Sequence, residues 1–184
     1  KTDSQIYFKG LNGLRFLAAL AVIITHVELL KNSFGFTSYW QNPVIFNLGG
    51  LGVYFFFVLS GFLITYLLLC EKAKHKEISI KKFYARRILR IWPLYYLVLA
   101  LGFCILPLFE PFHISYLENS FNKNYFPNLI LYLFILPNVA FSFFPAVPNI
   151  GQMWSIGVEE QFYIVWPWLI MKSKSIIKTL LIVL

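Results

Sequence analysis

The sequence predicts an all-α, polytopic membrane protein, built as a bundle of transmembrane helices. Hydrophobic residues make up 59% of the 184-residue chain, charged residues only 13%, and the mean hydropathy is +0.68. A soluble domain of this length carries more charge and fewer apolar residues. The apolar residues also gather in runs close to the ~20 residues that a helix needs to cross a hydrocarbon core. These observations exclude an ordinary soluble domain.

Four apolar segments reach spanning length, at residues 11–30, 48–70, 88–108 and 154–171. A fifth apolar run begins near Ser175, and the chain stops within it. We therefore expect residues 1–184 to be the N-terminal part of a transmembrane domain whose remaining helices are absent.

Basic residues predict the orientation of these spans, because loops rich in Lys and Arg stay in the cytoplasm. Eight of the sixteen basic residues lie in 72–90, which accounts for the net charge of +8 without nucleic-acid binding. With the N-terminus inside, fourteen basic residues are cytoplasmic and only Lys31 and Lys123 are outside. This count requires that 126–144 does not cross the membrane. A full crossing, the alternative, puts the last three lysines outside.

Segment 126–144 itself favours a re-entrant or interfacial course on the outer side. Pro127 and Pro137 lie within it, Pro145 follows it, and Asn128 and Asn138 interrupt its apolar character. Proline breaks a continuous helix. Non-helical backbone at membrane depth is tolerated where protein or a wet cavity covers it.

Arg15 and His26 lie at the two ends of the apolar stretch in the first span. Eleven residues make almost three helical turns, so both side chains project from one face, ~16 Å apart along the axis. Ionisable groups inside a spanning helix are costly and usually mark a functional site. Imidazole suits general-base chemistry near neutral pH. The alternative is a histidine that only hydrogen-bonds a neighbouring helix.

A polar stripe begins the fourth span. Ser155, Glu159 and Tyr163 recur every four residues and therefore share one helix face. A helix start with Ser155 as N-cap and acids in the first turns explains one of the two acids but not the stripe. We predict that this face lines a cavity, and that Glu159 and His26 meet there near the outer side.

The basic cluster divides into two parts. Arg86, Arg87 and Arg90 continue into the third span. Three guanidinium groups on one turn can bind the phosphate oxygens of a polyanionic cofactor, or they can extend to lipid headgroups. The other part is a solvated run of five lysines, which the acidic inner leaflet attracts. These lysines are Lys72, Lys74, Lys76, Lys81 and Lys82.

Small residues in the second span predict close helix packing. They are Gly49, Gly50, Gly52 and Gly61. Ser60 can bond backbone or a neighbouring helix, and a role on a substrate path is the weaker alternative. The three histidines are scattered without metal-ligand spacing, so no metal is predicted.

Together these stretches resemble the membrane domain of acyltransferase family 3, which includes the O-acetyltransferases of bacterial surface polysaccharides. Four motifs in the family's order carry the resemblance. They are Arg15 with His26 after ten intervening positions, Phe55-Phe56 leading to Ser60-Gly61, Arg86-Arg87-x-x-Arg90-x-x-Pro93, and Trp154-Ser155-x-x-x-Glu159-Glu160-Gln161-Phe162-Tyr163.

The resemblance implies a multi-pass cell-membrane enzyme of about ten helices, of which this chain holds four or five. It implies acetyl-CoA (or another acyl-CoA) as cytoplasmic donor and a hydroxyl of an extracytoplasmic carbohydrate or glycolipid as acceptor. His26 with Glu159 is then the expected catalytic pair. The residues expected at the donor are Arg15, Arg86, Arg87 and Arg90. Those expected at the acceptor substrate are Ser60, Ser155 and Tyr163.

Two other classes of function stay open from the residues alone. Intramembrane His, Glu and Arg also build the proton relays of proton-coupled transporters. Inverted repeats would favour a transporter, and the sequence contains none that we detect. A nonenzymatic lipid-binding or scaffold protein would use the basic loop alone.

Overall fold

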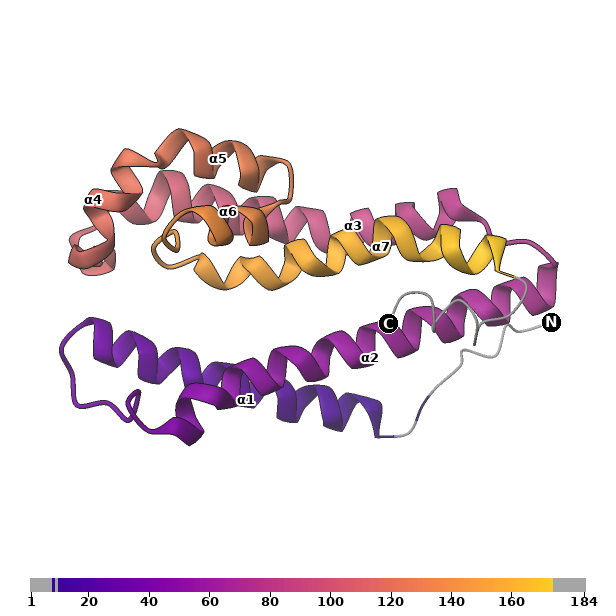
Figure 1. Ribbon diagram of the computed structural model, residues 1–184, viewed down its shortest axis with the longest axis horizontal. Helices are drawn as coiled ribbons and strands as arrows, with labels where there is room; N and C mark the ends of the chain where they lie inside the picture. The colour runs from indigo at the N-terminus through magenta and orange to yellow at the C-terminus, as the bar shows by residue number, and fades with distance from the viewer. Residues whose placement is uncertain (1–7, 9, 174–184) are drawn as a thin grey trace. The chain divides into compact units, whose positions relative to one another are not determined.

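The computed structural model describes residue 8 and residues 10–173, and these residues form helices and connecting turns without a β-strand. The chain divides into two compact units, Lys1–Ile64 and Thr65–Leu184. Figure 1 labels the α-helices. The helices are α1 (Leu11–Ser33), α2 (Pro43–His75), α3 (Ile80–Ala100), α4 (Ser115–Lys123), α5 (Tyr125–Leu133), α6 (Pro137–Phe143) and α7 (Trp154–Lys172). Shorter turns are η1 (Leu101–Ile105), η2 (Leu106–Leu108), η3 (Glu110–Phe112) and η4 (Gly151–Met153).

Three helices in the described part of the chain are long and apolar enough to cross a membrane, as predicted for the first three spans. They are Leu11–Ser33, Pro43–His75 and Ile80–Leu108. The fourth predicted span, 154–171, forms α7 but does not reach the same hydropathy. Three successive polar residues, Glu159, Glu160 and Gln161, lower it. The predicted fifth run lies outside the described residues.

In the first unit, α1 and α2 approach closely through small side chains. The Thr25 hydroxyl donates to the carbonyl oxygens of Ala21 (3.1 Å) and Ile45 (3.0 Å). A Cβ on Gly49 would lie 2.9 Å from the Thr25 side chain, and one on Gly52 only 2.8 Å from a backbone oxygen of α1. Backbones this close need glycine, so the predicted packing is confirmed at these two positions.

The other two glycines of α2 do not take part in this packing. Among the described residues, a Cβ on Gly50 or Gly61 would meet no atom within 4 Å. The predicted close approach is therefore not found at these two positions in the part of the chain that the structure describes. The helical period explains the difference, because Gly49 and Gly52 are three residues apart on one face, whereas Gly50 is turned ~100° from Gly49.

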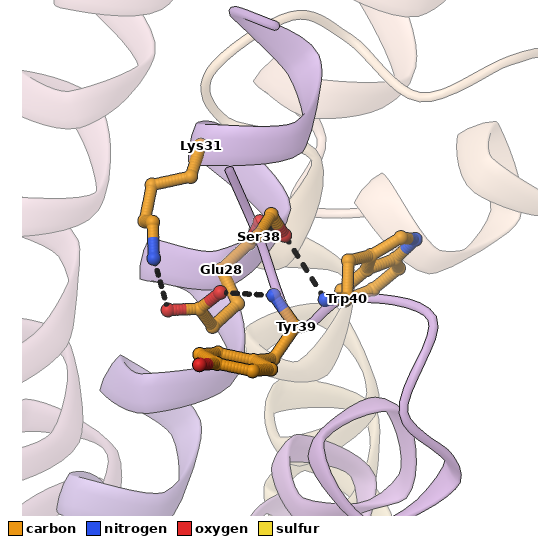
Figure 2. Close-up of polar contacts among 5 residues, drawn as sticks. All are labelled: Glu28, Lys31, Ser38, Tyr39 and Trp40. Carbon is orange, nitrogen blue, oxygen red and sulfur yellow. Dashed lines mark hydrogen bonds and ion pairs between the residues drawn. The ribbon is translucent and has the colours of Figure 1, made fainter. Parts of the chain in front are cut away.

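The connection from α1 to α2 is held by Glu28 (Figure 2). Its Oε1 lies 2.7 Å from the Lys31 ammonium, and its Oε2 accepts from the Tyr39 amide at 2.6 Å. The Ser38 hydroxyl donates to the Glu28 carbonyl oxygen at 2.8 Å and accepts from the Trp40 amide at 2.9 Å. These bonds fix the loop that begins after Ser33, about two helical turns beyond His26.

In the second unit, α3 and α7 lie side by side and run in opposite directions (Figure 1). The Tyr84 hydroxyl donates to the Ile164 carbonyl oxygen (2.7 Å) and accepts from the Trp168 indole (3.0 Å). Farther along α3, the Trp92 indole donates to Glu160 Oε2 at 3.2 Å. The start of α3 therefore lies beside the second half of α7.

The segment between these two helices leaves and returns at the same end of the pair. Gly102, just after α3, packs so tightly on Ile150, just before α7, that a Cβ would lie 2.6 Å from the isoleucine side chain. Between them, α5 and α6 contain 9 and 7 residues. Such helices extend only ~14 Å and ~11 Å, too short to cross a core of ~30 Å. The predicted re-entrant course fits this arrangement, and a single crossing helix does not.

The α5–α6 reversal has its own local geometry. The Leu136 amide donates to the Leu131 carbonyl oxygen at 2.8 Å, and Ile135 adopts a φ of 58°. A left-handed residue with this hydrogen bond is a common way to end a helix. The Tyr95 hydroxyl of α3 then donates to the Tyr132 carbonyl oxygen at 2.7 Å, so α5 is tied to α3.

Close packing also joins α6 to α7. A Cβ on Gly157 would lie 2.5 Å from Asn138 Oδ1 and 2.9 Å from Pro137. Next to this contact, the side-chain amides of Asn138 and Gln161 donate to each other at 3.2 and 3.1 Å. The polar Asn138 therefore has a specific partner on α7 at the closest approach of the two helices.

The structure corrects the sequence interpretation of Lys72. It was expected in the solvated lysine run, but its ammonium group donates to the carbonyl oxygens of Ile170 (2.9 Å), Met171 (3.1 Å) and Ser173 (2.7 Å). The last carbonyls of a helix lack partners within the helix, and an ammonium group has three donors to offer. Lys72 thus caps α7, and the C-terminal ends of α2 and α7 lie together.

Candidate active site

His26 is held in one tautomer by its own helix. Its Nδ1 lies 2.8 Å from the carbonyl oxygen of Val22. A carbonyl oxygen can only accept, so Nδ1 carries the hydrogen of this bond, and in the neutral imidazole Nε2 then keeps its lone pair. The ring is half-buried on α1. His26 therefore presents Nε2 as a proton acceptor, which is what a general base needs.

Arg15 and Ser60 lie toward the other end of the α1–α2 pair. Helix α1 is unbroken from Leu11 to Ser33, so Arg15 keeps the predicted ~16 Å from His26 along the axis. Ser60 lies eleven residues beyond Gly49, which packs on Thr25 beside His26. The register therefore brings Ser60, half-buried, to the level of Arg15 rather than that of His26.

In the second unit, the predicted stripe on α7 joins one of the predicted donor arginines. The Tyr163 hydroxyl donates to Glu159 Oε2 at 3.0 Å. The guanidinium carbon of Arg87 lies 5.5 Å from the centre of the Tyr163 ring and 5.6 Å from that of Phe83. Tyr163 itself is only 4% exposed. A carboxylate, a phenol and a guanidinium group thus form one connected cluster between α3 and α7.

The three α3 arginines among the four predicted at the donor do not point the same way. Arg86 Nη2 lies 3.7 Å from Glu71 Oε2, while Glu71 Oε1 accepts from the Ser79 amide at 3.0 Å. Arg90 is exposed, and Arg87 is turned toward α7. Successive helical residues project ~100° apart, so Arg86 and Arg90 share a face from which Arg87 departs. A polyanion would meet Arg86 and Arg90 on a surface and Arg87 inside.

Ser155 does not cap α7. The helix begins at Trp154 after the η4 turn, its first residue follows Met153, and no side chain caps it. The Ser155 hydroxyl instead donates back to the Gln152 carbonyl oxygen at 3.2 Å. The N-cap interpretation is therefore wrong, because the preceding turn already starts the helical winding before Ser155.

Sequence reasoning did not assign Glu160 a role. Its side chain is 8% exposed, Oε2 accepts from the Trp92 indole, and Oε1 is buried without a hydrogen-bond partner among the described residues. Adjacent residues of a helix project ~100° apart, so two consecutive acids cannot both belong to the Ser155–Glu159–Tyr163 stripe. That geometry was the signal in the sequence for a second polar face on α7.

Glu160 lines a cavity of about 520 Å³ between α3, the α5–α6 reversal and α7, which we call the seam cavity. The polar and aromatic residues on its wall include Tyr84, Arg87, Trp92, Tyr96, Glu160 and Tyr163. The cavity therefore connects the Arg87–Tyr163 cluster with the Trp92–Glu160 pair. No three His, Cys, Asp or Glu side chains gather as a metal site in the parts of the chain that the structure describes.

His26 and Glu159 belong to different units, since His26 lies before residue 64 and Glu159 after it. Their predicted meeting therefore stays a prediction. Arg15 and the arginines of α3 are separated in the same way.

Comparison with known proteins shows which family the chain belongs to. A profile describing an acyltransferase domain matches residues 8–184. The chain belongs to acyltransferase family 3. As a family member it is a membrane protein with an all-α membrane bundle, and the predicted resemblance is confirmed. No solved structure matches the chain.

Three relatives describe the part of the family that the chain resembles. "Peptidoglycan O-acetyltransferase OatA" of Listeria monocytogenes is 32% identical over 165 residues, which cover 89% of this chain and 24% of the relative. "Putative peptidoglycan O-acetyltransferase YrhL" of Bacillus subtilis is 32% identical over 182 residues, 97% of this chain and 26% of the relative. "O-acetyltransferase OatA" of Staphylococcus aureus is 31% identical over 189 residues, which cover 100% of this chain and 29% of the relative. The chain thus spans about a quarter of the length of these relatives.

Proposed function

We propose that this chain forms part of a multi-pass membrane O-acetyltransferase that moves an acetyl group from cytoplasmic acetyl-CoA to a hydroxyl of an extracytoplasmic carbohydrate. Peptidoglycan is the proposed acceptor, because two similar family members are named "Peptidoglycan O-acetyltransferase OatA" and "Putative peptidoglycan O-acetyltransferase YrhL". The observation that carries the proposal is the hydrogen bond from His26 Nδ1 to Val22, which leaves Nε2 as an available base.

In the proposed reaction, His26 Nε2 takes the proton of the acceptor hydroxyl while the hydroxyl oxygen attacks the thioester carbonyl carbon. The tetrahedral intermediate collapses, the carbon–sulfur bond breaks, and the sulfur leaves with the proton from the imidazolium. The products are the acetyl ester and free CoA. Glu159 stabilises the imidazolium if the two residues meet as predicted.

A covalent route uses the same nitrogen. His26 Nε2 attacks the thioester carbonyl carbon, the carbon–sulfur bond breaks, and CoA leaves as a thiolate while an acetyl-imidazolium forms. The acceptor hydroxyl oxygen then takes the acetyl group, and its proton passes to the released Nε2 and from there to the thiolate. Both routes need the Nδ1 hydrogen bond to direct Nε2. Rapid denaturation near neutral pH of a reaction with labelled donor and no acceptor separates them, because only the covalent route leaves label on the protein and acid would hydrolyse an acetyl-imidazole.

The donor side of the proposal rests on the arginines at the start of α3. Arg86 and Arg90 share one face, where guanidinium groups suit the phosphates of CoA. Arg87 lies inside, against Tyr163. Arg86→Ala and Arg90→Ala are expected to weaken acetyl-CoA binding, and the loss should be smaller at high salt, since exposed charges are screened.

The test uses the complete protein in membranes, with acetyl-labelled CoA and peptidoglycan fragments. Wild-type protein should transfer label to the glycan, and His26→Ala should abolish transfer while leaving the protein in the membrane. His75→Ala is the matched control, because His75 is exposed at the end of α2 and is expected to have no role. Normal transfer by the His26→Ala variant would remove His26 from the mechanism. Solute flux without CoA consumption would favour the transporter class.

A further inference from the structure

The seam cavity has one buried polar atom that the protein itself does not satisfy. Glu160 is 8% exposed, and its Oε2 accepts from Trp92, whereas its Oε1 has no hydrogen-bond partner within the described residues. Buried polar atoms are almost always paired, because an unpaired one loses its hydrogen bonds to water without replacement. Glu160 also lines a cavity of about 520 Å³. A ligand with a hydrogen-bond donor would satisfy Oε1.

The other hydrogen-bonding side chains on the wall are already engaged. Tyr84 donates to Ile164, Tyr96 donates to the Leu133 carbonyl oxygen at 3.0 Å, and Tyr163 donates to Glu159. Gln161 is paired with Asn138. The tyrosine oxygens can accept a further hydrogen bond, but none of them is a buried atom left without a partner. Among the described wall residues, Glu160 Oε1 is therefore the buried polar atom that lacks a partner.

Arg87 supplies the second polar feature of the cavity. Its contacts in the described structure are with the ring faces of Phe83 and Tyr163. Stacking engages the face of a guanidinium group, whose five N–H donors lie in its plane and can still reach an acceptor oxygen. The wall thus offers one acceptor at Glu160 and a set of donors at Arg87.

The cavity is also elongated along the helix pair. Its lining runs along α3 from Tyr84 to Tyr96, twelve residues and therefore ~18 Å of helix. Between these ends the wall consists mainly of aromatic rings and of the aliphatic residues Leu133, Ile135 and Leu136 of the reversal. Such a site takes a slim, mostly apolar molecule with an N–H group and a carbonyl oxygen, which are the two groups of a secondary amide.

We propose that the seam cavity binds the amide-bearing arm of the acyl-thioester donor, with Glu160 Oε1 accepting an amide N–H and Arg87 donating to an amide carbonyl oxygen. This assignment rests on the proposed acetyl-CoA-dependent function. It adds Glu160 and Trp92 to the residues of the donor site. Trp92 holds one carboxyl oxygen and so orients the other.

The test measures binding to the complete protein in lipid nanodiscs by calorimetry. The probe is a thioether analogue of acetyl-CoA, which cannot transfer its acyl group, together with two further analogues in which one or the other amide N–H is replaced by an ester oxygen. Wild-type protein should bind one of the two ester analogues roughly tenfold more weakly than the parent, the expected effect of losing one hydrogen bond to a buried carboxyl group. This comparison needs no variant protein.

The Glu160→Gln variant should bind the parent analogue roughly tenfold more weakly than wild type does. Its affinities for the amide and ester analogues should differ less than about twofold, because the substitution in the protein and the ester in the ligand remove the same hydrogen bond. Glu110→Gln, which alters an exposed carboxylate outside the seam cavity, should leave both values unchanged. Equal binding of all three analogues by wild type, or full discrimination by Glu160→Gln, would overturn the assignment. If wild type still transfers acetyl groups from CoA in that case, the proposed function stands without it. If wild type neither binds acetyl-CoA nor transfers its acetyl group, the proposed function itself falls.

Discussion

The ammonium group of Lys72 lies 2.9 Å from the carbonyl oxygen of Ile170, although the two residues are 98 positions apart in the sequence. Two further carbonyl oxygens, of Met171 and Ser173, complete its hydrogen bonds. This contact ties the end of α2 to the end of α7. It also gives α7 the direction that the distribution of basic residues predicts, with its C-terminus on the side of the Lys- and Arg-rich loop.

Removing this cap should destabilise the second unit. Lys72→Met keeps the length of the side chain but loses three donors, so three carbonyls at the negative end of α7 lose their partner. We expect the free energy of unfolding to fall by about 2 kcal/mol. Thermal unfolding of the complete protein in nanodiscs measures it. Lys82→Met is the control, since Lys82 is exposed near the start of α3, where loss of a positive charge is neutral or slightly stabilising. Equal melting temperatures for the two variants would contradict the capping role.

Two neighbouring glycines of α2 should respond differently to the same change. In Gly52→Ala the new methyl group would lie 2.8 Å from the Ala18 carbonyl oxygen, so α1 and α2 must separate. Gly50→Ala adds a methyl group in open space. We expect Gly52→Ala to cost about 1–3 kcal/mol, as overpacking typically does, and Gly50→Ala to be neutral or stabilising through helix propensity. Melting temperatures report both, and equal responses would mean that α1 and α2 do not pack as described.

Tyr163→Phe separates the two contacts of Tyr163. The variant keeps the ring that stacks on Arg87 but loses the hydroxyl that donates to Glu159. If Glu159 acts with His26, this variant should lower kcat by roughly tenfold, the value of one charge-assisted hydrogen bond, while the KM for the donor changes little. Steady-state kinetics with acetyl-CoA check this. A raised donor KM at unchanged kcat would assign the hydroxyl to donor binding.

Arg87 should be sensitive to a replacement that conserves charge. Lysine cannot stack a planar guanidinium group on Phe83 and Tyr163, so Arg87→Lys loses ~1 kcal/mol of cation–π interaction and the fork of donors toward the cavity. We expect the donor affinity of this variant to fall roughly fivefold or more, because ~1 kcal/mol of interaction energy corresponds to about a fivefold change in the dissociation constant. Lys82→Arg changes an exposed cation outside the proposed donor residues and should change affinity less than about twofold. Equal donor affinities of the two variants would contradict the role of Arg87 at the donor.

Much of the fold follows from hydropathy and charge, because both act along long stretches of chain. The apolar runs mark α1, α2 and α3, and the prolines mark the broken segment that becomes α5 and α6. The excess of basic residues at one side of the spans predicts the direction in which α7 runs. The helices, the broken segment and the antiparallel course of α3 and α7 are confirmed, because each depends on many residues at once rather than on one contact. The side of the membrane on which each end lies stays a prediction.

The errors concern single side chains whose partners are distant in the sequence. Lys72 is one of five similar lysines in its run, and only the position of α7 distinguishes it. The Trp92–Glu160 hydrogen bond joins residues 68 positions apart, so no local pattern indicates it. Ser155 fits the composition of an N-cap, but the η4 turn before it had no clear signal in the sequence.

The contact of Gly102 with Ile150 has a consequence for how the protein can change. It brings the two ends of segment 102–150 into contact, so that this segment leaves the α3–α7 pair and returns to it at the same place. Tyr132, Ile135 and Ala140 of this segment pack in one core with α3, so the segment can change in length only outside these residues if α3 and α7 are to keep their register. A change at Leu133 or Leu136 would also reshape the wall of the seam cavity.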